Sequence, residues 1–344
     1  MKAARLYAPQ ILKIEDVEIP EVNDEEVLIE NKVALTCGTD LKMYKRGHPY
    51  AKLPLTIGHE FAGTIVKTGF KVKNFKEGDR VVAVNSAPCN VCFYCKRGKQ
   101  NLCEKIEEDM IGFTVEGAYA QYVKVPAKIV KQNMHIIPEH VSFEEAAILE
   151  PLACVVHGNQ LLNLSVKDDV AIIGSGPIGL LHLQLIKAEG CKAIVIDLFK
   201  DRLKVAEELG ADVTINASEV DAVNEVRKLT NGRGVDVAIE AVGLPETWRN
   251  AIALTRRGGE TLLFGGCKPG EIVEFDASHI HYGELTIKGA FHHTPLAVEK
   301  ALKLIASKTI KIDKMISCRM RLNNIEDALK LMSEGKAVKV AIIP

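Results

Sequence analysis

Four of the nine cysteines in the chain lie within one stretch of sixteen residues, PCNVCFYCKRGKQNLC. The four are Cys89, Cys92, Cys95 and Cys103. A [4Fe–4S] cluster is disfavoured because Cys103 lies far from Cys95 and is followed by Glu104 instead of proline. The spacing is typical of a closed tetrahedral zinc site with all four positions filled. We therefore expect this cluster to stabilise structure and the reaction to occur elsewhere in the chain.

A second set of metal-binding residue types is spread over a longer stretch. Cys37 occurs in ALTCGTDLKMY, and His59 and Glu60 are adjacent in TIGHEFAGTIVKTG. A thiolate, an imidazole and a carboxylate around one zinc ion leave a coordination position open, as a catalytic site requires. Taken singly, each of these residues is equally compatible with a purely structural role.

A glycine loop predicts a dinucleotide site. Gly174, Gly176 and Gly179 form G-x-G-x-x-G between an expected strand and an expected helix, whose N-terminus would face a pyrophosphate. Asp197 ends the next expected strand, where its carboxylate can accept hydrogen bonds from both ribose hydroxyls and repel a 2′-phosphate. The pattern favours NAD over NADP, although Arg202 could weaken that preference.

Two regions with different patterns of secondary structure are expected to position these residues. Up to about residue 150, short β-like stretches separated by turn signals predict a compact, mostly β domain. From about residue 168, strands that are apolar throughout alternate with helices of 10–15 residues, which predicts a doubly wound parallel sheet. Thr294 is expected to cap another helix that starts at Pro295, and KAVKVAIIP is expected to form a final strand.

Composition excludes several classes of protein. The 344 residues suffice for two domains, 47% are hydrophobic, and the net charge of −1 provides no basic field for nucleic acid or an anionic membrane. The stretch MKAARLYAPQILKIEDVEIP contains no apolar run of the length expected for a signal peptide, and the sequence contains no uninterrupted apolar span of about 18 residues. One cysteine cluster among otherwise scattered thiols is typical of a reducing compartment. We expect a cytoplasmic protein that binds neither nucleic acid nor membrane.

The metal-binding stretches resemble a known family. The pattern G-H-E-x-x-G-x5-G-x-x-V over residues 58–72, with C-G-T-D over residues 37–40, resembles the zinc-dependent medium-chain alcohol and polyol dehydrogenases. The resemblance extends over essentially the whole chain and implies an α/β protein. It implies a GroES-like, mostly β catalytic domain (1–151), a Rossmann domain (152–288), and a tail (289–344) that returns to the catalytic domain. In this family the four-cysteine lobe is structural.

The branch follows from Glu150 in LEPLA, where alcohol dehydrogenases proper carry a second zinc-binding cysteine. The Glu-Pro-Leu form is similar to sorbitol, threonine and sugar-alcohol-phosphate dehydrogenases. This resemblance implies that Cys37, His59 and Glu60 hold the metal. It places Glu150 close enough to bind the metal directly, or to hold its water or the substrate hydroxyl. A site with two carboxylates suits a hydrophilic polyol better than an apolar alcohol.

The reaction expected from the resemblance is hydride transfer from a secondary carbinol carbon to nicotinamide. Thr39 occupies the position of the family's relay hydroxyl. Lys42 stands where alcohol dehydrogenases often carry a relay histidine. A lysine completes such a relay only if burial or zinc lowers its pKa toward neutral. A solvated surface lysine is the alternative interpretation, and Lys42→Ala distinguishes the two by its effect on turnover at neutral and high pH.

The resemblance also implies a set of cofactor contacts in the glycine loop, after the later strands and at the start of the tail. These are Gly174, Gly176, Pro177, Ile178, Gly179, Asp197, Arg202, Gly265, Gly266, Phe291 and His292.

Two departures from the sorbitol dehydrogenase pattern bear on the substrate. Met43 stands where those enzymes carry a tyrosine, and His292-His293 stands where they carry Arg-Tyr. Sorbitol is therefore disfavoured. The loop LKMYKRGHPYAKLP could attract a phosphate or carboxylate of the substrate, or it could be a solvated basic loop. Its basic residues are Lys42, Lys45, Arg46 and His48.

Taken together, the sequence predicts an oxidoreductase with two zinc ions per chain that passes a hydride to NAD. The expected substrate is a polyol, a sugar alcohol or a sugar-alcohol phosphate, and L-threonine is an alternative. A non-catalytic NAD-binding relative is a second hypothesis, against which the joint retention of Cys37, His59, Glu60 and Glu150 argues. Relatives in the polyol branch imply a homo-oligomer, either a tetramer or a dimer.

Overall fold

The computed structural model describes residues 1–344, and the chain divides into two compact units. Unit 1 contains Met1–Cys154, His292–Lys308 and Ile316–Pro344. Unit 2 contains Val155–Phe291 and Thr309–Met315. Helix α4 (Leu149–Asn159) carries the chain from the first unit into the second. No helix in the structure is both long and apolar enough to span a membrane.

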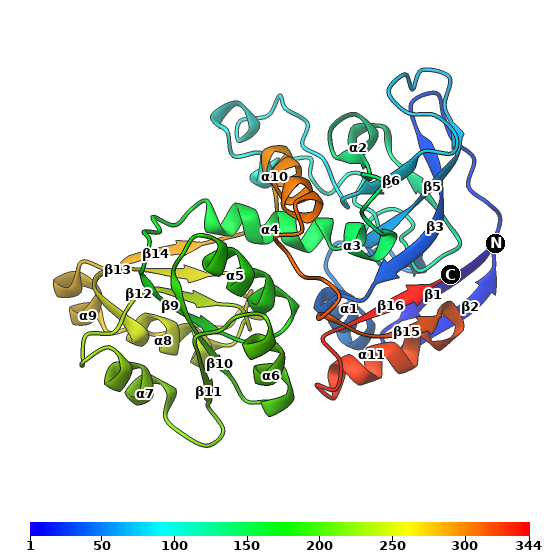
Figure 1. The fold of residues 1–344 in the computed structure, drawn as a ribbon. Helices are drawn as coiled ribbons and strands as arrows, with labels where there is room; N and C mark the ends of the chain where they lie inside the picture. The colour runs from blue at the N-terminus through cyan, green and yellow to red at the C-terminus, as the bar shows by residue number, and fades with distance from the viewer. The chain divides into compact units, whose positions relative to one another are not determined.

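Unit 1 is mostly β structure (Figure 1). Its larger sheet has seven strands, in the order β15-β16-β3-β5-β6-β8 with β7 paired to β3, and its smaller sheet has the order β2-β1-β4. The strands are β1 (Lys2–Ala8), β2 (Ile11–Asp16), β3 (Val27–Leu35), β4 (Leu55–Thr56), β5 (Glu60–Thr68), β6 (Arg80–Ala83), β7 (Tyr122–Val125), β8 (Met134–Ile136), β15 (Ile316–Arg321) and β16 (Lys339–Ile343).

Short helices connect these strands. They are α1 (Gly38–Arg46), α2 (Ala127–Gln132), α3 (Phe143–Ala147), α10 (Pro295–Ala306) and α11 (Ile325–Ser333), with 3₁₀ turns η1 (Cys95–Arg97), η2 (Gln100–Leu102) and η3 (Leu322–Asn324). The predicted start of a helix at Pro295 is confirmed: Thr294 caps α10, and its side chain accepts a hydrogen bond from Ala297 N. The predicted final strand is confirmed as β16.

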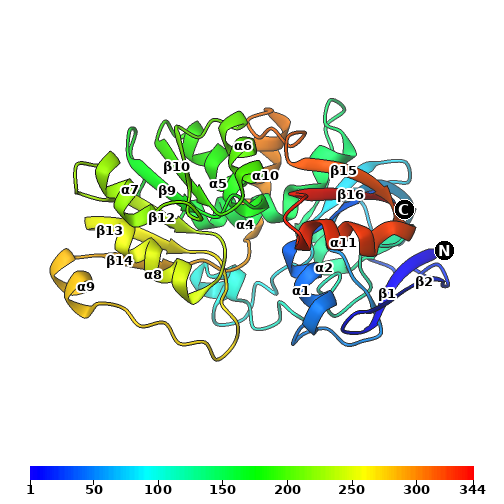
Figure 2. The same cartoon turned by 90° about the horizontal axis from the view of Figure 1, so that it is seen from below.

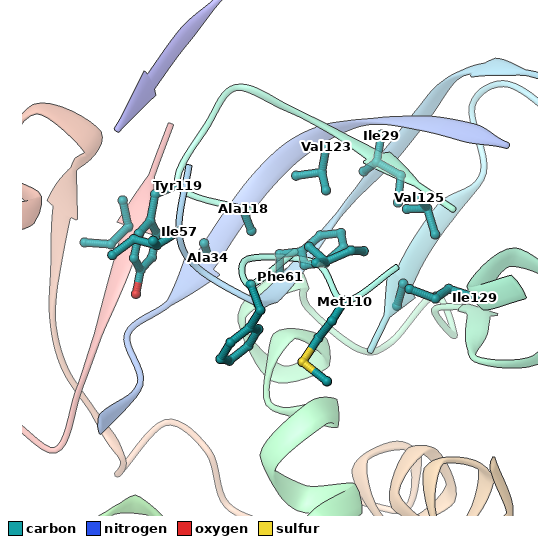
Figure 3. Packing of buried hydrophobic residues seen from close by; sticks show 14 of the residues in the cluster. Ile29, Ala34, Ile57, Phe61, Met110, Ala118, Tyr119, Val123, Val125 and Ile129 are labelled. Carbon is teal, nitrogen blue, oxygen red and sulfur yellow. The ribbon is translucent and has the colours of Figure 1, made fainter. Parts of the chain in front are cut away.

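The core of unit 1 lies against β3 and β5. Figure 3 shows Ile29, Phe61, Val123 and Val125 among the packed apolar side chains. Each of these four is almost fully buried. Burying an aliphatic or aromatic side chain contributes roughly 1.5–3 kcal/mol, so this packing holds the backbone of β5 firmly from its first residues onward. Glu60 directly precedes Phe61 in β5, so its backbone is held in place by the same packing.

Unit 2 confirms the doubly wound parallel sheet. Its six strands have the order β11-β10-β9-β12-β13-β14, with all pairs parallel. The helices that connect them flank the sheet (Figures 1 and 2). In chain order the elements are β9 (Asp169–Ile173), α5 (Pro177–Ala188), β10 (Lys192–Asp197), α6 (Lys200–Glu208), β11 (Val213–Asn216), α7 (Ala222–Leu229), β12 (Val235–Glu240), α8 (Pro245–Leu254), β13 (Thr255–Leu263), α9 (Ala277–Gly283) and β14 (Thr286–Gly289).

The strand order reverses beside β9, because β10 lies on one side of it and β12 on the other. In open α/β sheets ligands bind outside the carboxyl ends of the strands at such a switch point. The glycine loop follows β9 directly, so the topology of unit 2 places it where a dinucleotide site is expected.

Candidate functional site

Cys37, His59 and Glu60 converge in unit 1. One donor atom from each residue lies within 4.8 Å of the other two. Cys37 caps helix α1, and His59 and Glu60 stand where the chain enters β5. His59 and Glu60 are buried and Cys37 is partly buried. The Oε1 atom of Glu60 is buried without a hydrogen-bond partner. A buried carboxylate oxygen beside a thiol and an imidazole fits a zinc ion.

Asp40 fixes the orientation of His59. Its Oδ1 lies 3.0 Å from His59 Nδ1, and its Oδ2 accepts a hydrogen bond of 2.6 Å from the Tyr119 hydroxyl. All three side chains are buried. Engagement of Nδ1 leaves Nε2 of His59 available to a metal, which is the usual arrangement around ligating histidines. Burial lowers the pKa of His59, but the nearby Asp40 and Cys37 outweigh it and hold the pKa well above its ordinary value.

A glycine makes room for this arrangement. Gly58 adopts φ +96°, a backbone conformation that side chains other than glycine rarely accept. A Cβ atom there would lie 2.9 Å from the Tyr119 ring. The glycine of the G-H-E stretch therefore lets Tyr119 approach closely enough to reach Asp40.

Lys339 supports Glu60 from the other end of the chain. Its Nζ donates to Glu60 Oε2 and, at 3.0 Å, to the Thr36 carbonyl, and the lysine is only 1% exposed. Strand register explains the contact, since β16 and β5 both pair with β3, where Leu35 faces Glu60 on one side and Ala341 on the other. Burial raises the pKa of Glu60 above its ordinary value, although Lys339 and His59 oppose the shift.

Glu150 lies in a different group of potential ligands. Its carboxylate, on helix α4, stands with His292 and His293, one donor atom of each lying within 4.8 Å of the others. The Cys154 thiol lies 3.7 Å from Glu150 Oε1. Burial raises the pKa of Glu150 to about 7. The structure thus brings three of the four predicted ligands of the catalytic metal together and places the fourth with the two histidines of the tail.

The predicted relay residues both lie on helix α1. The Thr39 backbone N–H points to Cys37 Sγ at 3.5 Å, which keeps Thr39 next to the proposed metal. Lys42 is exposed to solvent. This exposure fits the alternative interpretation of a solvated surface lysine. The relay remains a prediction.

The basic residues predicted to lie in a loop have mixed surroundings, and the loop prediction is wrong for Lys42, Lys45 and Arg46, which lie on α1. Lys45 donates to the Ser333 hydroxyl, and Lys42 and Arg46 are exposed. His48 is half-buried and its ring lies edge-on to Phe113, with centroids 5.1 Å apart; Phe113 also lies 5.1 Å from the His59 ring. Burial lowers the pKa of His48.

The four predicted zinc ligands of the lobe are close together. The four Sγ atoms lie within 4.8 Å of one another, and Cys92 Sγ is 4.0 Å from Cys103 Sγ. Tetrahedral zinc with bonds of 2.3 Å needs sulfurs about 3.8 Å apart, so the lobe fits the ion with little movement. Backbone N–H groups of Cys95 and Glu104 lower the pKa of Cys92 to about 6, and burial raises the pKa of Cys95 to about 12.

The glycine loop of unit 2 borders a cavity of about 510 Å³. Gly174, Gly176, Asp197 and Arg202 line it, and their contact with a cofactor remains a prediction. Gly174 adopts φ +97°, and a Cβ atom there would lie 2.7 Å from a methyl group of Val242. Both facts favour glycine at this position. Pro177 begins α5, and Ile178 and Gly179 continue its first turn.

Asp197 is held in place by its own neighbours. Its Oδ2 accepts hydrogen bonds from Ser175 N and Ser175 Oγ at 2.6 and 2.8 Å, and its Oδ1 accepts one from Phe199 N at 3.0 Å. The guanidinium of Arg202 lies 5.0 Å from the Phe199 ring. The carboxylate therefore stands at a fixed position at the cavity wall.

The remaining predicted cofactor residues lie in two segments. Gly265 and Gly266 follow β13, and Trp248 Nε1 donates to the Gly265 carbonyl at 2.8 Å. Phe291, the last residue of the main segment of unit 2, is exposed. His292 begins the returning segment of unit 1 and lies 2.6 Å from Ser86 Oγ through Nε2. Their contact with a cofactor remains a prediction.

Sequence reasoning missed four supporting residues. The first three are Asp40, Tyr119 and Lys339. The fourth is Glu240, whose Oε1 accepts hydrogen bonds from Val242 N and Gly243 N at 2.9 and 2.8 Å at the end of β12. Two signals were available: a lysine in the otherwise apolar strand VKVAII, and a glutamate that ends the apolar strand VDVAIE. Tyr119 carries no such signal.

Known proteins resemble this chain over its full length. The family described as alcohol dehydrogenase GroES-like domain matches residues 23–137, and that described as zinc-binding dehydrogenase matches residues 177–307. Sorbitol dehydrogenase of Bacillus subtilis is 34% identical over 100% of this chain and 97% of the relative. D-arabitol-phosphate dehydrogenase of Enterococcus avium is 35% identical over 95% of this chain and 92% of the relative.

A solved structure shows the same fold. A zinc-binding dehydrogenase from Sinorhizobium meliloti, determined with NADP bound, has a TM-score of 0.93 and 33% identity, covering 100% of this chain and 99% of that one.

Proposed function

We propose, given that this chain belongs to the zinc-dependent medium-chain dehydrogenases of the polyol branch, that it oxidises a secondary hydroxyl of a polyol, a sugar alcohol or a sugar-alcohol phosphate. The observation that carries the proposal is the convergence of Cys37, His59 and Glu60 donor atoms within 4.8 Å at a buried position. Zinc held there would supply a Lewis acid that lowers the pKa of a substrate hydroxyl toward neutral.

The residues around the metal position prepare this chemistry. Asp40 orients His59 by contacting its Nδ1 atom. Lys339 binds Oε2 of Glu60, which leaves Oε1 of Glu60 without a hydrogen-bond partner and available to a metal ion. Thr39 lies two residues after Cys37, where its hydroxyl can accept the substrate proton and pass it outward. Lys42, one turn along the same exposed helix face, is the next acceptor in the proposed relay.

NAD is the proposed hydride acceptor. When bound, the nicotinamide ring supplies the redox chemistry, and unit 2 supplies binding and orientation. The fixed carboxylate of Asp197 favours two ribose hydroxyls and opposes a 2′-phosphate. NADP is a second candidate, because Arg202 lines the same cavity and the Sinorhizobium meliloti structure contains NADP.

A hydrophilic substrate is supported by the charge of unit 1. Glu60 and Glu150 are buried carboxylates that influence one another's charge state, and both favour hydroxyl groups over hydrocarbon. Lys42 and Arg46 are exposed and available to a phosphate group, which fits the relative that acts on D-arabitol phosphate. L-threonine belongs in the same test, since its secondary hydroxyl can undergo the same oxidation.

The test is reduction of NAD and of NADP by the zinc-loaded chain with a panel of polyols, their phosphates, simple secondary alcohols and threonine. We expect kcat/KM to favour NAD at least tenfold and polyol-type substrates over simple alcohols. Tight NAD binding without turnover on any member of the panel would favour the non-catalytic alternative instead.

Three further properties belong to this proposal. We expect two resident zinc ions per chain, one at Cys37, His59 and Glu60 and one in the four-cysteine lobe. We also expect a cytoplasmic protein and a homo-oligomer, either a dimer or a tetramer. Metal analysis and light scattering of the purified chain test the stoichiometry and the oligomeric state.

A further inference from the structure

We propose that Glu240, which ends strand β12 of unit 2, is a positioning residue of the dinucleotide site, and that its buried negative charge raises the affinity for NAD relative to NADH. The proposal rests on the proposed use of NAD. It concerns the binding of the cofactor alone, so it is measured without a substrate.

Glu240 lies at the crevice of the parallel sheet where a dinucleotide is expected. It pairs with Ile173, the last residue of β9 before the glycine loop, and Ala241 N donates to the Ile173 carbonyl at 2.9 Å. Asp197 ends β10, on the other side of β9. A dinucleotide lies across such a crevice. Because Asp197 is proposed to bind the adenosine ribose, the side of the crevice at β12 is left to the nicotinamide half.

One carboxylate oxygen of Glu240 fixes the loop that follows β12. Its Oε1 accepts hydrogen bonds from Val242 N at 2.9 Å, Gly243 N at 2.8 Å and the Thr247 hydroxyl at 2.7 Å. Val242 and Thr247 line the same cavity of about 510 Å³ as the glycine loop. The carboxylate therefore determines the position of one wall of the proposed cofactor cavity.

The backbone carbonyl of Glu240 fixes a second loop, the one that follows β13. It accepts hydrogen bonds from Phe264 N and Gly265 N, both at 3.0 Å. Gly265 and Gly243 pack backbone against backbone, since a Cβ atom on Gly265 would lie 2.3 Å from Gly243 N. Gly265 is one of the predicted cofactor contacts. Glu240 thus joins the two loops that are expected to surround the nicotinamide half.

The other carboxylate oxygen carries a buried charge that no cation neutralises. Glu240 is 0% exposed, and its Oε2 has no hydrogen-bond partner. The Gly265 backbone lies directly beside this atom, since a Cβ atom on Gly265 would be 2.6 Å from Oε2. A buried carboxylate without a cation is costly. A positive charge brought to the crevice offsets part of that cost.

The two redox forms of the cofactor differ in the charge of the nicotinamide ring. The oxidised ring is a pyridinium with one positive charge, whereas the ring of NADH is neutral. A unit charge at a distance of about 10 Å, with an effective dielectric constant of about 20, changes a binding constant roughly tenfold. The carboxylate should therefore favour NAD over NADH by about this factor. This preference favours the form of the cofactor that accepts a hydride from an alcohol.

The test is direct binding of NAD and of NADH to zinc-loaded wild type and Glu240→Gln, by calorimetry for NAD and by cofactor fluorescence for NADH. Burial raises the pKa of Glu240, although the Gly243 N–H and the Thr247 hydroxyl oppose the shift, so pH 8 is chosen to favour the ionised carboxylate. Glutamine keeps an acceptor oxygen for the same donors and removes the charge. The ratio of the Kd of NADH to the Kd of NAD should fall about tenfold.

Asp236→Asn is the matched control. Asp236 lies near the amino end of the same strand and also accepts a hydrogen bond from a backbone N–H, that of Asp169, at 2.8 Å. Its charge is paired with Arg256 and lies about 13 Å along the strand from Glu240. Asp236→Asn should keep the wild-type ratio of the two Kd values, even where its Tm falls.

Glu240→Asp separates the charge from the position of the loops. Aspartate keeps the charge but is one methylene shorter, so it should weaken the binding of NAD and NADH by a similar factor and leave their ratio within about twofold of wild type. A purely structural contribution of Glu240 predicts an unchanged ratio in both variants. An unchanged ratio in Glu240→Gln, or an equal fall in Glu240→Asp, would overturn the proposal.

Thr247→Val provides a second test that leaves Glu240 in place, for the case that Glu240→Gln does not fold. Loss of the hydroxyl removes one donor from Oε1, so less of the negative charge is neutralised and the ratio should rise about twofold. A ratio that stays constant or falls in Thr247→Val would contradict the electrostatic effect.

The same measurements distinguish this inference from the proposed function. Absence of NAD binding by wild type would overturn both. Binding of NAD and NADH with the same ratio in wild type and Glu240→Gln would overturn only the proposed effect of Glu240, because turnover is measured separately with the substrate panel.

Discussion

The four-cysteine lobe and the Cys37 group are both groups of potential metal ligands in unit 1, but they are built differently. The lobe takes its potential ligands from residues 89–103, and all four are cysteine thiols. The Cys37 group combines sulfur, nitrogen and oxygen donors and takes its support from Tyr119 and Lys339, far away in the chain. A closed site of like ligands stabilises a loop, whereas a mixed site with distant supports can hold a reactive position open.

The largest expected effect is a loss of activity when the Cys37 group, but not the four-cysteine lobe, is altered. Cys37→Ser should lower kcat/KM by about 10³-fold or more, because the Lewis acid contributes several kcal/mol to transition-state stabilisation. The Tm should change by only a few degrees, since the core of β3 and β5 stays intact. Steady-state kinetics, the zinc count and thermal unfolding measure these three quantities.

The matched variant in the lobe is Cys95→Ser. We expect it to lower the Tm by roughly 5–10 °C, equivalent to about 2–3 kcal/mol, because the ion contributes to folding. Activity per folded molecule should remain within a few-fold of wild type. A large loss of kcat/KM in Cys95→Ser without loss of stability would reverse the assignment of the two sites.

The same contrast explains what the sequence can predict. The lobe and the helix that starts at Pro295 depend on neighbouring residues, so spacing and capping rules suffice for them. Asp40 is 79 residues from Tyr119 and Glu60 is 279 residues from Lys339, and only strand pairing with β3 brings the latter two together. Similarly, the sequence predicts Glu150 as a metal ligand and His292 as a cofactor contact, but their closeness to each other depends on the direction of α4 and on the left-handed backbone of His292.

The second prediction tests the distant support of Glu60. Lys339→Met leaves the buried Glu60 carboxylate without its cation, which should cost the metal-free chain about 3–5 kcal/mol of unfolding free energy. Zinc at Glu60 supplies positive charge, so the loss should be smaller in the zinc-loaded chain. Denaturant unfolding with and without zinc measures the difference.

Lys336→Met is the control for that measurement. Its ion pair with Glu334 spans 2.7 Å between exposed side chains, and loss of such a pair should change stability by less than about 1 kcal/mol in either state. Equal destabilisation of Lys339→Met with and without zinc would show that Glu60 gains nothing from the metal.

The third prediction concerns the support of His59. Asp40→Asn preserves the size of the side chain but removes the charge that faces His59 Nδ1 at 3.0 Å. Zinc affinity at the Cys37 group should fall about 10–100-fold, and affinity at the lobe should not change. Competition with a chromophoric chelator resolves the two ions. Tyr119→Phe, which removes only the 2.6 Å hydrogen bond to Asp40, should have a smaller effect in the same direction.

The smallest expected effect concerns the pH dependence of stability, and it follows from a comparison of the pKa of His59 with that of a buried histidine in unit 2. His182 is buried, and its Nδ1 lies 2.7 Å from Asn159 Oδ1, so its partner is a neutral amide instead of the carboxylate that faces His59. Burial consequently lowers the pKa of His182 to about 3 without the opposing charges that raise the pKa of His59. Equal burial thus gives opposite shifts, and the partner decides the direction.

This difference predicts how stability depends on pH. Between pH 6.5 and about 3, the unfolded chain binds a proton at His182 that the folded chain does not, so stability is lost as the pH falls through this window. Protonation in the unfolded state costs about 1.4 kcal/mol at pH 5.5 relative to pH 8. His182→Gln, which can still bond to Asn159 and does not titrate, should flatten this part of the curve. An unchanged slope in chemical unfolding between pH 8 and 5.5 would mean that His182 is protonated in the folded chain, and that the neutral amide stabilises its charge as a carboxylate would.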